Sequence, residues 1–444
     1  MNRAPPVAPS FRSASRFWWW LGFVSFGGPA GQIAIMHREL VERRRWISEQ
    51  RFLHALNYCM LLPGPEAQQL ATYIGWLLHG MRGALTAGGL FVLPSFFVLT
   101  LLSWIYMAYG HLPAVAAVLY GVKPAVTAIV AFAAWRIGSR ALRNAPMRAI
   151  AVAAFLAIFA LRLPFPLIIL GAAVIGFAGS RIKPAWFSQG GAHAAAQRDY
   201  GPALIDDDTP PPVHARFGTW RFARVVAAGL ALWVLALGAL WWSFDGGSLP
   251  LRMGGFFTGA ALLTFGGAYA VLPYVYQAAV AHYGWLTAPQ MIDGLALGET
   301  TPGPLIMIVT FVGFAGGWTR GVAGIASPLA AGALCAGVAT FFTFLPSFLF
   351  ILAGGPLVEA THGEIKFTAP LSAITAAVVG VVLNLAVFFA WHVLWPHGFG
   401  GGFEWPAAMI GLAALIALIH FRAGIMPLIG ACALAGLAVR WLAT

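Results

Sequence analysis

The chain has 444 residues, of which 60% are hydrophobic and only 9% are charged. Soluble proteins average about 25% charged residues, so this composition excludes a soluble globular enzyme and a disordered chain. The 26 Lys and Arg residues outnumber the 14 Asp and Glu residues. Because basic residues orient membrane proteins, we expect no nucleic-acid partner. The apolar runs are continuous rather than alternating, which predicts an all-α polytopic protein in a lipid bilayer rather than a β-barrel.

A basic stretch that contains Arg3, Arg12 and Arg16 precedes the first apolar run, at residues 17–26. This order is typical of a secretory signal, but no small-residue cleavage site follows. The run also recurs later in the chain. We therefore expect it to be a retained membrane segment.

Three sequence elements of the first half recur in the second half. A spacing of 239 residues relates Phe26-Gly27-Gly28 to Phe265-Gly266-Gly267, and Pro63-Gly64-Pro65 to Pro302-Gly303-Pro304. A Leu-Pro-Ser-Phe element at 93–96 recurs at 345–348, 252 residues later, so one insertion of 13 residues explains both spacings. The sequence therefore predicts two homologous halves.

A polar stretch separates the two halves. It contains three consecutive Asp and three consecutive Pro residues, at 206–208 and 210–212, a composition that predicts a solvated linker rather than a core. The apolar segment that follows has no counterpart in the first half and predicts an extra transmembrane helix. We divide the chain into a first membrane repeat at 1–180, a linker at 181–220, an inverting helix at 221–245 and a second repeat at 246–444.

Matching loops of the two halves differ in charge. The segment 37–51 carries five Arg residues and 136–148 carries four, whereas the matching segments 276–290 and 388–400 carry no Lys or Arg. Equivalent loops with opposite bias should face opposite sides of the membrane. The sequence thus predicts an inverted repeat, with the N-terminus and the linker in the cytoplasm.

Helix-breaking residues interrupt the apolar runs of both halves at matching positions. At membrane depth, irregular backbone survives only where it is buried in protein or lines a cavity. A single break would indicate a kink, but breaks repeated across an inverted pair favour broken or re-entrant helices around a binding site. Each break starts a half-helix whose first N–H groups have no partner and carry partial positive charge. The predicted ligand is therefore a tetrahedral oxyanion.

The predicted substrate-binding residues are those of the breaks and the polar residues beside them. They are Gly27, Gly28, Pro63, Gly64, Pro65, Gln68, Gln69, Lys123, Gly266, Gly267, Thr300, Thr301, Pro302, Gly303 and Pro304.

Three ionisable residues stand inside predicted membrane segments, where such residues are functional candidates by default. Glu66 and Glu299 each lie close to a break. Either carboxylate could cap the helix dipole or couple protons to transport. Lys123 lies in the middle of a predicted span and could be a counter-charge for the substrate or for Glu66, or belong to a structural ion pair.

Other functional classes find little support in the sequence. His392 and His397 lack the spacing and the companion ligands of a metal site, so we expect no metal. The chain has no nucleotide-binding loop and no nucleophile–base set, so we expect no cofactor and no enzymatic activity. An anion channel and a lipid flippase remain alternatives, and the sequence leaves a homodimer open.

The broken elements resemble those of the chromate ion transporter family of bacterial inner-membrane proteins. The resemblance rests on the Phe-Gly-Gly, Pro-Gly-Pro and Leu-Pro-Ser-Phe elements of both halves. It implies export of chromate and chromate resistance, with sulfate as a competitor. Apart from the resemblance, a negative interior favours export of a dianion, which could run on membrane potential alone or be coupled to protons through Glu66 and Glu299. The alternative is a channel or transporter for sulfate or another oxyanion.

Overall fold

The computed structural model describes residues 6–26, 28–187, 200–210, 212–265, 267–360 and 368–442. These residues form helices and loops, with two isolated bridges as the only β-type pairing among them. Continuous apolar runs favour this outcome because, in lipid, a helix satisfies its own backbone hydrogen bonds.

The first half and the linker contain ten helical elements among the described residues. They are α1 (Phe11–Val24), α2 (Gly28–His37), η1 (Arg38–Arg43), α3 (Glu49–Leu61), α4 (Glu66–Tyr109), α5 (Pro113–Ala141), α6 (Ala145–Phe159) and α7 (Phe165–Ile182), followed in the linker by α8 (Pro184–Phe187) and η2 (Val213–Ala215). Helix α4 is kinked at His79 and Gly80, where Gly80 has a φ of 61°.

The second half begins after one additional helix. The elements are α9 (Thr219–Phe244), α10 (Leu249–Leu262), α11 (Ala268–Tyr276), η3 (Gln277–His282), α12 (Ala288–Thr300), η4 (Leu305–Met307), α13 (Ile308–Arg320), α14 (Pro328–Ala360), α15 (Thr368–Leu394), α16 (Trp405–Ile419) and α17 (Ile425–Leu442).

The internal repeat extends to irregular details of the backbone. The π-helical turns η1 and η3 lie 239 residues apart, the spacing of the sequence repeat. The side chains of Ser48 and Thr287 cap α3 and α12 at matching positions. Gly64 and Gly303 both adopt positive φ, 126° and 100°. The predicted two homologous halves are thereby confirmed.

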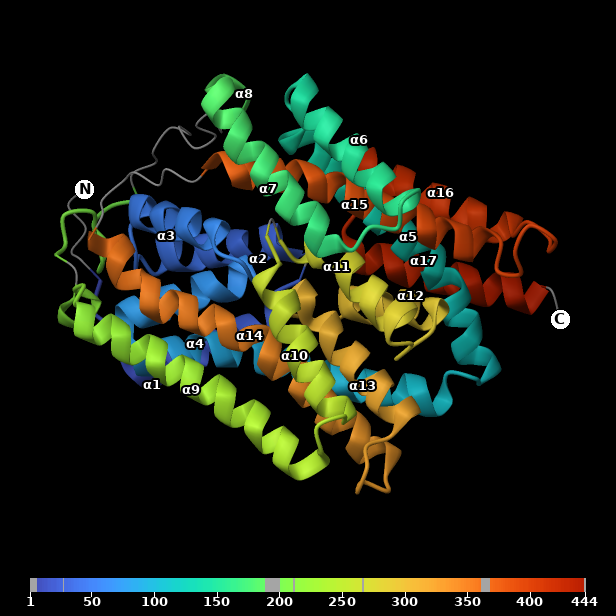
Figure 1. Ribbon diagram of the computed structural model, residues 1–444, viewed down its shortest axis with the longest axis horizontal. Coiled ribbons are helices and arrows are strands. Elements are labelled where there is room, and N and C mark those ends of the chain that lie inside the picture. Colours follow the sequence, from blue (N-terminus) through green and yellow to red (C-terminus); the bar gives the residue numbers. More distant parts are fainter. Residues whose placement is uncertain are drawn as a thin grey trace.

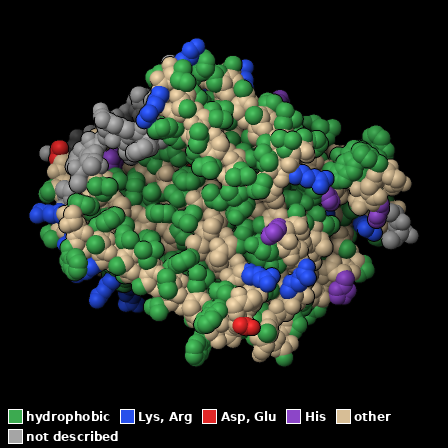
Figure 2. All heavy atoms as spheres, in the orientation of Figure 1, with side chains coloured by type: hydrophobic (Ala, Val, Ile, Leu, Met, Phe, Trp, Pro, Cys, Tyr) green, Lys and Arg blue, Asp and Glu red, His purple; other side chains and the backbone are tan. Residues whose placement is uncertain are grey.

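Within the described residues, seven helices are long and apolar enough to cross a membrane: α4, α5, α7, α9, α14, α15 and α17. Hydrophobic side chains are spread over the whole face seen in Figure 2, and Asp and Glu are sparse on it. Helix α9 has no buried residue at all, so its apolar surface is available to lipid. The chain is a multi-pass membrane protein.

The helices form two bundles that mix the halves (Figure 1). One, here called the scaffold bundle, contains α5, α6 and α7 with α15, α16 and α17. In it α5 packs on α16 and α17, and α15 packs on α6 and α7. Such an exchange of equivalent contacts is the signature of a two-fold relation. Glycines permit the close approach: Gly436 lies against Gly121, and its counterpart Gly176 lies against Ala373.

The other bundle, here called the hairpin bundle, contains α1–α4 and α10–α14. Its two re-entrant hairpins are α2–α3, the first hairpin, and α11–α12, the second hairpin. Each hairpin begins at the Phe-Gly-Gly break of its half and ends at the Pro-Gly-Pro break. Helix α9 lies along α10 and α14 at the edge of this bundle (Figure 1).

Part of the linker packs more closely than its polar composition predicts. Leu204 N–H donates to the Arg45 carbonyl at 2.9 Å, and Ser48 N–H donates to the Ile205 carbonyl at 3.0 Å. Ile205 is buried. Backbone pairing, which composition does not reveal, fastens this segment to the end of the first hairpin. Residues 188–199 lie outside the described residues.

Candidate functional site

The breaks of the two halves meet each other at the centre of the molecule. Gly64 N–H donates to the Thr264 carbonyl at 2.8 Å, and Gly303 N–H donates to the Ser25 carbonyl at 2.6 Å. Ser25 and Thr264 themselves occupy matching positions, 239 residues apart. Each half thus offers the same donor to the same acceptor of the other, so a two-fold relation also governs this centre.

The Pro-Gly-Pro turns are packed against the Leu-Pro-Ser-Phe elements of the opposite half. A Cβ on Gly64 would lie 2.5 Å from Ser347 Oγ, and a Cβ on Gly303 would overlap Ser95. The Ser95 hydroxyl also donates to the Pro302 carbonyl. The recurrence of both motifs therefore has a structural cause, because each turn fits around the serine of the other half.

The Phe-Gly-Gly turns differ from the Pro-Gly-Pro turns in having free space beside them. Gly28 and Gly267 have φ values of 71° and 96°, and an added Cβ on either would meet no atom within 4 Å. Gly28 is nevertheless buried. A side chain at either position would therefore meet open space rather than neighbouring atoms. Gly27 and Gly266, also predicted site residues, lie outside the described residues.

Three buried glutamines give the centre a polar lining on the first-half side. Gln32 Nε2 donates to the Gly303 carbonyl at 2.5 Å, and Gln69 Nε2 donates to the Pro63 carbonyl at 2.8 Å. Gln68 is equally buried, and the Oε1 atoms of all three glutamines lack a hydrogen-bond partner within the described part of the chain. The matching positions of the second half are apolar: Val271, Met307 and Ile308. A ligand at the centre would therefore meet unpaired amide oxygens on the first-half side only. If an amide group turned over, it would offer its N–H donors to the ligand instead.

Lys123 forms an ion pair with a residue outside the predicted site. Its Nζ lies 3.4 Å from Asp293 Oδ2, to which the Tyr106 hydroxyl also donates at 2.8 Å. Asp293 is 3% exposed. The counter-charge of Lys123 in this structure is thus Asp293 and not Glu66. An intramembrane lysine requires a nearby anion; the sequence shows Asp293 before the second break but does not pair it with Lys123.

The two predicted coupling residues have different surroundings. Glu299 is buried and accepts a hydrogen bond of 2.7 Å from the Tyr269 hydroxyl, and the Arg136 guanidinium lies within electrostatic reach. Glu66 is partly buried at the start of α4 and has no hydrogen bond or ion pair from its side chain to another described residue. Of these two residues, Glu66 is therefore the one whose carboxylate has no partner among the described residues.

Arg136 lies in a different place from the one expected. The sequence assigned it to a basic loop at 136–148, but α5 continues to Ala141 and Arg136 is partly buried within it. From sequence alone, basic residues at the end of a long apolar span are assigned to the loop that follows it. In the structure the first of these residues, Arg136, belongs to the last turns of α5, which places its positive charge near Glu299.

Thr300 and Thr301 bond to their own helix. Their hydroxyls donate to the carbonyls of Leu297 and Gly298, both at 2.9 Å. In this arrangement they satisfy the end of α12. Their oxygens could still accept a hydrogen bond, but the hydroxyl protons are already used.

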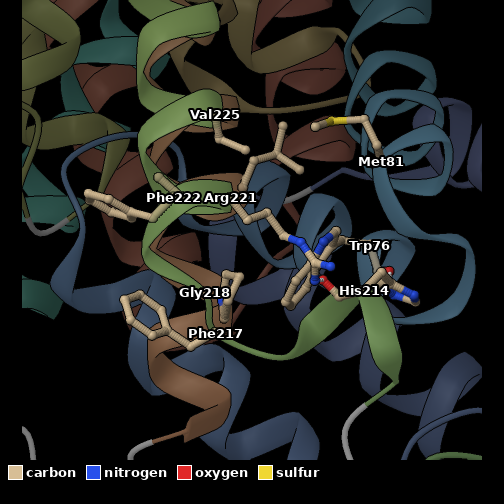
Figure 3. A pocket seen from close by; sticks show the side chains of 11 residues that line it. Trp76, Met81, His214, Phe217, Gly218, Arg221, Phe222 and Val225 are labelled. Carbon is tan, nitrogen blue, oxygen red and sulfur yellow. Dashed lines mark hydrogen bonds between the residues drawn. The ribbon is translucent and has the colours of Figure 1, made fainter.

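Two pockets on the protein lie away from the breaks. One, of about 260 Å³, is bounded by the α4 kink and the start of α9. Figure 3 shows Arg221 directed toward His214 and Trp76 there, and His214 Nε2 lies 2.8 Å from the Trp76 carbonyl. The other, of about 330 Å³, lies between α3 and the linker. Neither pocket includes a residue of the predicted site.

These features define a polytopic α-helical membrane protein with two homologous halves whose broken helices cross at the centre. The sequence profile of the family described as chromate transporter matches residues 13–177 and 251–437. The chain belongs to this family. The two matched segments correspond to the two halves and omit the linker and α9.

Relatives that are named for chromate transport align with most of the chain. The chromate transport protein of Cupriavidus metallidurans is 29% identical over 94% of this chain and 90% of its own length. The chromate transport protein of Pseudomonas aeruginosa is 32% identical over 81% of this chain and 76% of its own length. A probable chromate transport protein of Synechococcus elongatus is 28% identical over 92% and 90%. No solved structure matches the chain.

Proposed function

We propose that this protein is a secondary transporter that exports chromate from the cytoplasm across the bacterial inner membrane and thereby confers chromate resistance. Family membership, together with relatives named for chromate transport, carries the proposal. The crossing of the breaks supports it, because such a centre is where broken-helix transporters bind their substrates.

The predicted substrate-binding residues offer an anion suitable partners. The first N–H groups of α4 follow Pro65, and those of η4 follow Pro304, so two helix starts flank the crossing. Space beside Gly28 and Gly267 would admit the ligand. Lys123 supplies a positive charge, and Gln68 and Gln69 supply amide groups. Sulfate has the same shape and charge as chromate, so we expect it to compete.

Energetics favour export. A membrane potential is worth about 2.3 kcal/mol per charge per 100 mV, so a dianion that leaves a negative interior gains roughly twice that. Protons could add to this force through Glu66 or Glu299. A carboxylate beside an anion repels it unless it is protonated. Glu66, whose side chain has no partner in the described part of the chain, is the better placed of the two.

Counterflow in proteoliposomes tests the substrate. Vesicles preloaded with chromate should accumulate radiolabelled chromate transiently, and external sulfate should reduce the uptake. Sulfate counterflow without chromate counterflow would assign the protein to sulfate. Flux that neither saturates nor shows competition would indicate a channel.

Replacement of Lys123 in the same assay tests the charge. We expect Lys123→Gln to weaken chromate binding by about tenfold or more, because a charge-assisted contact to a dianion is lost. Lys123→Arg should keep part of the binding. Unchanged affinity in the Gln variant, with normal amounts of protein in the membrane, would leave Lys123 a purely structural role.

We propose further that the two-fold axis lies in the membrane plane, with the N-terminus and the linker in the cytoplasm. The matched positions Arg43 and His282, at the ends of η1 and η3, should then face opposite sides. In intact cells, an impermeant thiol reagent should label His282→Cys and not Arg43→Cys. Labelling of both variants from outside would contradict the inversion.

A further inference from the structure

The two hairpins are equivalent in sequence position but not in burial. Asn57 of the first hairpin is exposed, whereas its counterpart Ala296 is 2% exposed. Met60 is 45% exposed, whereas its counterpart Glu299 is 7% exposed. The same face of the hairpin is therefore open in the first half and covered in the second.

Helix packing explains this difference. In the second hairpin, α12 lies against α5 and α17 of the scaffold bundle, and α11 lies against α15 and α7. Among the described residues, α2 and α3 pack mainly on α4 and have at most marginal contact with the scaffold bundle. The second hairpin is thus covered by the scaffold bundle, and the first hairpin is not.

The first hairpin is firmly attached to its own bundle. Arg51 of α3 forms a buried ion pair of 2.7 Å with Glu359 of α14. The Tyr58 hydroxyl donates to the Phe350 carbonyl at 2.9 Å. The open face therefore belongs to the hairpin bundle as a body, and closure would require that bundle to move against the scaffold bundle.

A charged contact joins the two bundles on the closed side. Asp293 of α12 and Tyr106 of α4 belong to the hairpin bundle, and Lys123 of α5 belongs to the scaffold bundle. The positions that match Asp293 and Lys123 on the open side are His54 and Thr375. A histidine and a threonine cannot form this ion pair, so the two sides differ in chemistry as well as in conformation.

We propose that Tyr106, Asp293 and Lys123 form a latch that holds the second hairpin closed, and that its release lets the hairpin bundle rock until the first hairpin closes instead. This inference rests on the proposed transport function, because transport is what the motion would serve. Asp293 and Tyr106 are then positioning residues that set the balance between two conformations. With the orientation proposed above, the structure is closed toward the periplasm and open toward the cytoplasm.

Thiol labelling of Asn57→Cys and Ala296→Cys tests the latch without any substrate. A charged, water-soluble methanethiosulfonate reagent is applied to purified protein in detergent, where it reaches both sides. The three native cysteines are buried and set the background rate. We expect Asn57→Cys to react faster than Ala296→Cys.

Adding Asp293→Asn should move the two rates in opposite directions. Labelling at position 296 should rise by about tenfold, and labelling at position 57 should fall, because a two-state balance shifts toward the other conformation. Tyr106→Phe removes the hydroxyl that orients Asp293 toward Lys123, so it should act in the same sense with a smaller change. Glu404→Gln is the matched control: Glu404 also accepts from a tyrosine, Tyr120 at 2.7 Å, but this contact lies within the scaffold bundle.

The outcomes separate this inference from the proposed function. Unchanged rates in both latch variants, or a rise at both positions as in local unfolding, would overturn the latch. If Asn57→Cys and Ala296→Cys were labelled at equal rates in a protein with an intact latch, the asymmetry on which the latch proposal rests would be overturned. An absence of chromate counterflow would refute the substrate and leave the labelling result standing.

Discussion

Valine at Gly64 or Gly303 is expected to abolish chromate transport while the protein still inserts into the membrane. Both glycines have positive φ, which costs a β-branched residue about 1–3 kcal/mol. The added side chain would also overlap Ser347 in one case and Ser95 in the other, and such overpacking costs about 1–3 kcal/mol. Insertion depends on the apolar runs and should persist. Chromate uptake into inverted vesicles, normalised to protein in the membrane, measures the effect.

Gly89→Val provides the matched control. Gly89 lies in the continuous part of α4, and an added Cβ would meet no atom within 4 Å. A valine in a helix costs under about 1 kcal/mol relative to alanine, so uptake should stay near normal. Near-normal uptake by both Gly64→Val and Gly303→Val would show that the crossing tolerates side chains and that the transport path lies elsewhere.

Loss of one partner of the Arg51–Glu359 pair should have the largest effect on stability. Both side chains are buried, Tyr73 also donates to Glu359, and Arg51 donates to the Thr209 carbonyl. Arg51→Met leaves a buried carboxylate without its counter-charge, which costs about 3–5 kcal/mol. The double change with Glu359→Gln should recover much of this loss, because no lone charge remains. Thermal unfolding in detergent, monitored by the fraction of protein that stays native, measures the stability of the single and the double variant.

Arg43→Met is the comparison at the surface. Arg43 pairs with Glu39 at 2.7 Å, but its side chain is 65% exposed. Arg43 is largely solvated, and buried Glu39 keeps a second arginine, Arg44, at 3.7 Å. The loss should therefore cost only about 0–1 kcal/mol, and this variant should unfold near the temperature of the parent protein. An equally small effect of Arg51→Met would mean that Arg51 and Glu359 are solvated in the membrane-embedded protein.

Much of the architecture could be predicted because it depends on backbone requirements that particular residues reveal. A Pro-Gly-Pro motif in an apolar run interrupts the helix whatever the tertiary structure. The two motifs, with Gly64 and Gly303 at positive φ, do this at matching positions. The turns η1 and η3 obey the same spacing of 239 residues, although no sequence pattern predicted a π-helical turn at either place. Repetition of a break in a chain of this composition indicates homologous halves before any packing is known.

The partners of the polar side chains could not be predicted in the same way. Lys123 and Asp293 are 170 residues apart in the sequence and meet only because α12 packs on α5. The donors of Gly64 and Gly303 face carbonyls of the opposite half, a contact that exists only after the halves assemble. Arg136 carries no local sign that its helix extends past it. Such features depend on tertiary structure, and the substrate role of the predicted residues stays a prediction.

Helix α9 has no buried residue, and the family profile omits it. The crossing at Gly64 and Gly303 is made by the two halves alone. If the halves are inverted, α9 acts as a topological adaptor: it fixes the direction in which the second half is threaded and keeps the two halves in equal number. Two separate polypeptides, inserted in opposite directions by their own charge bias, would contain every contact of the crossing.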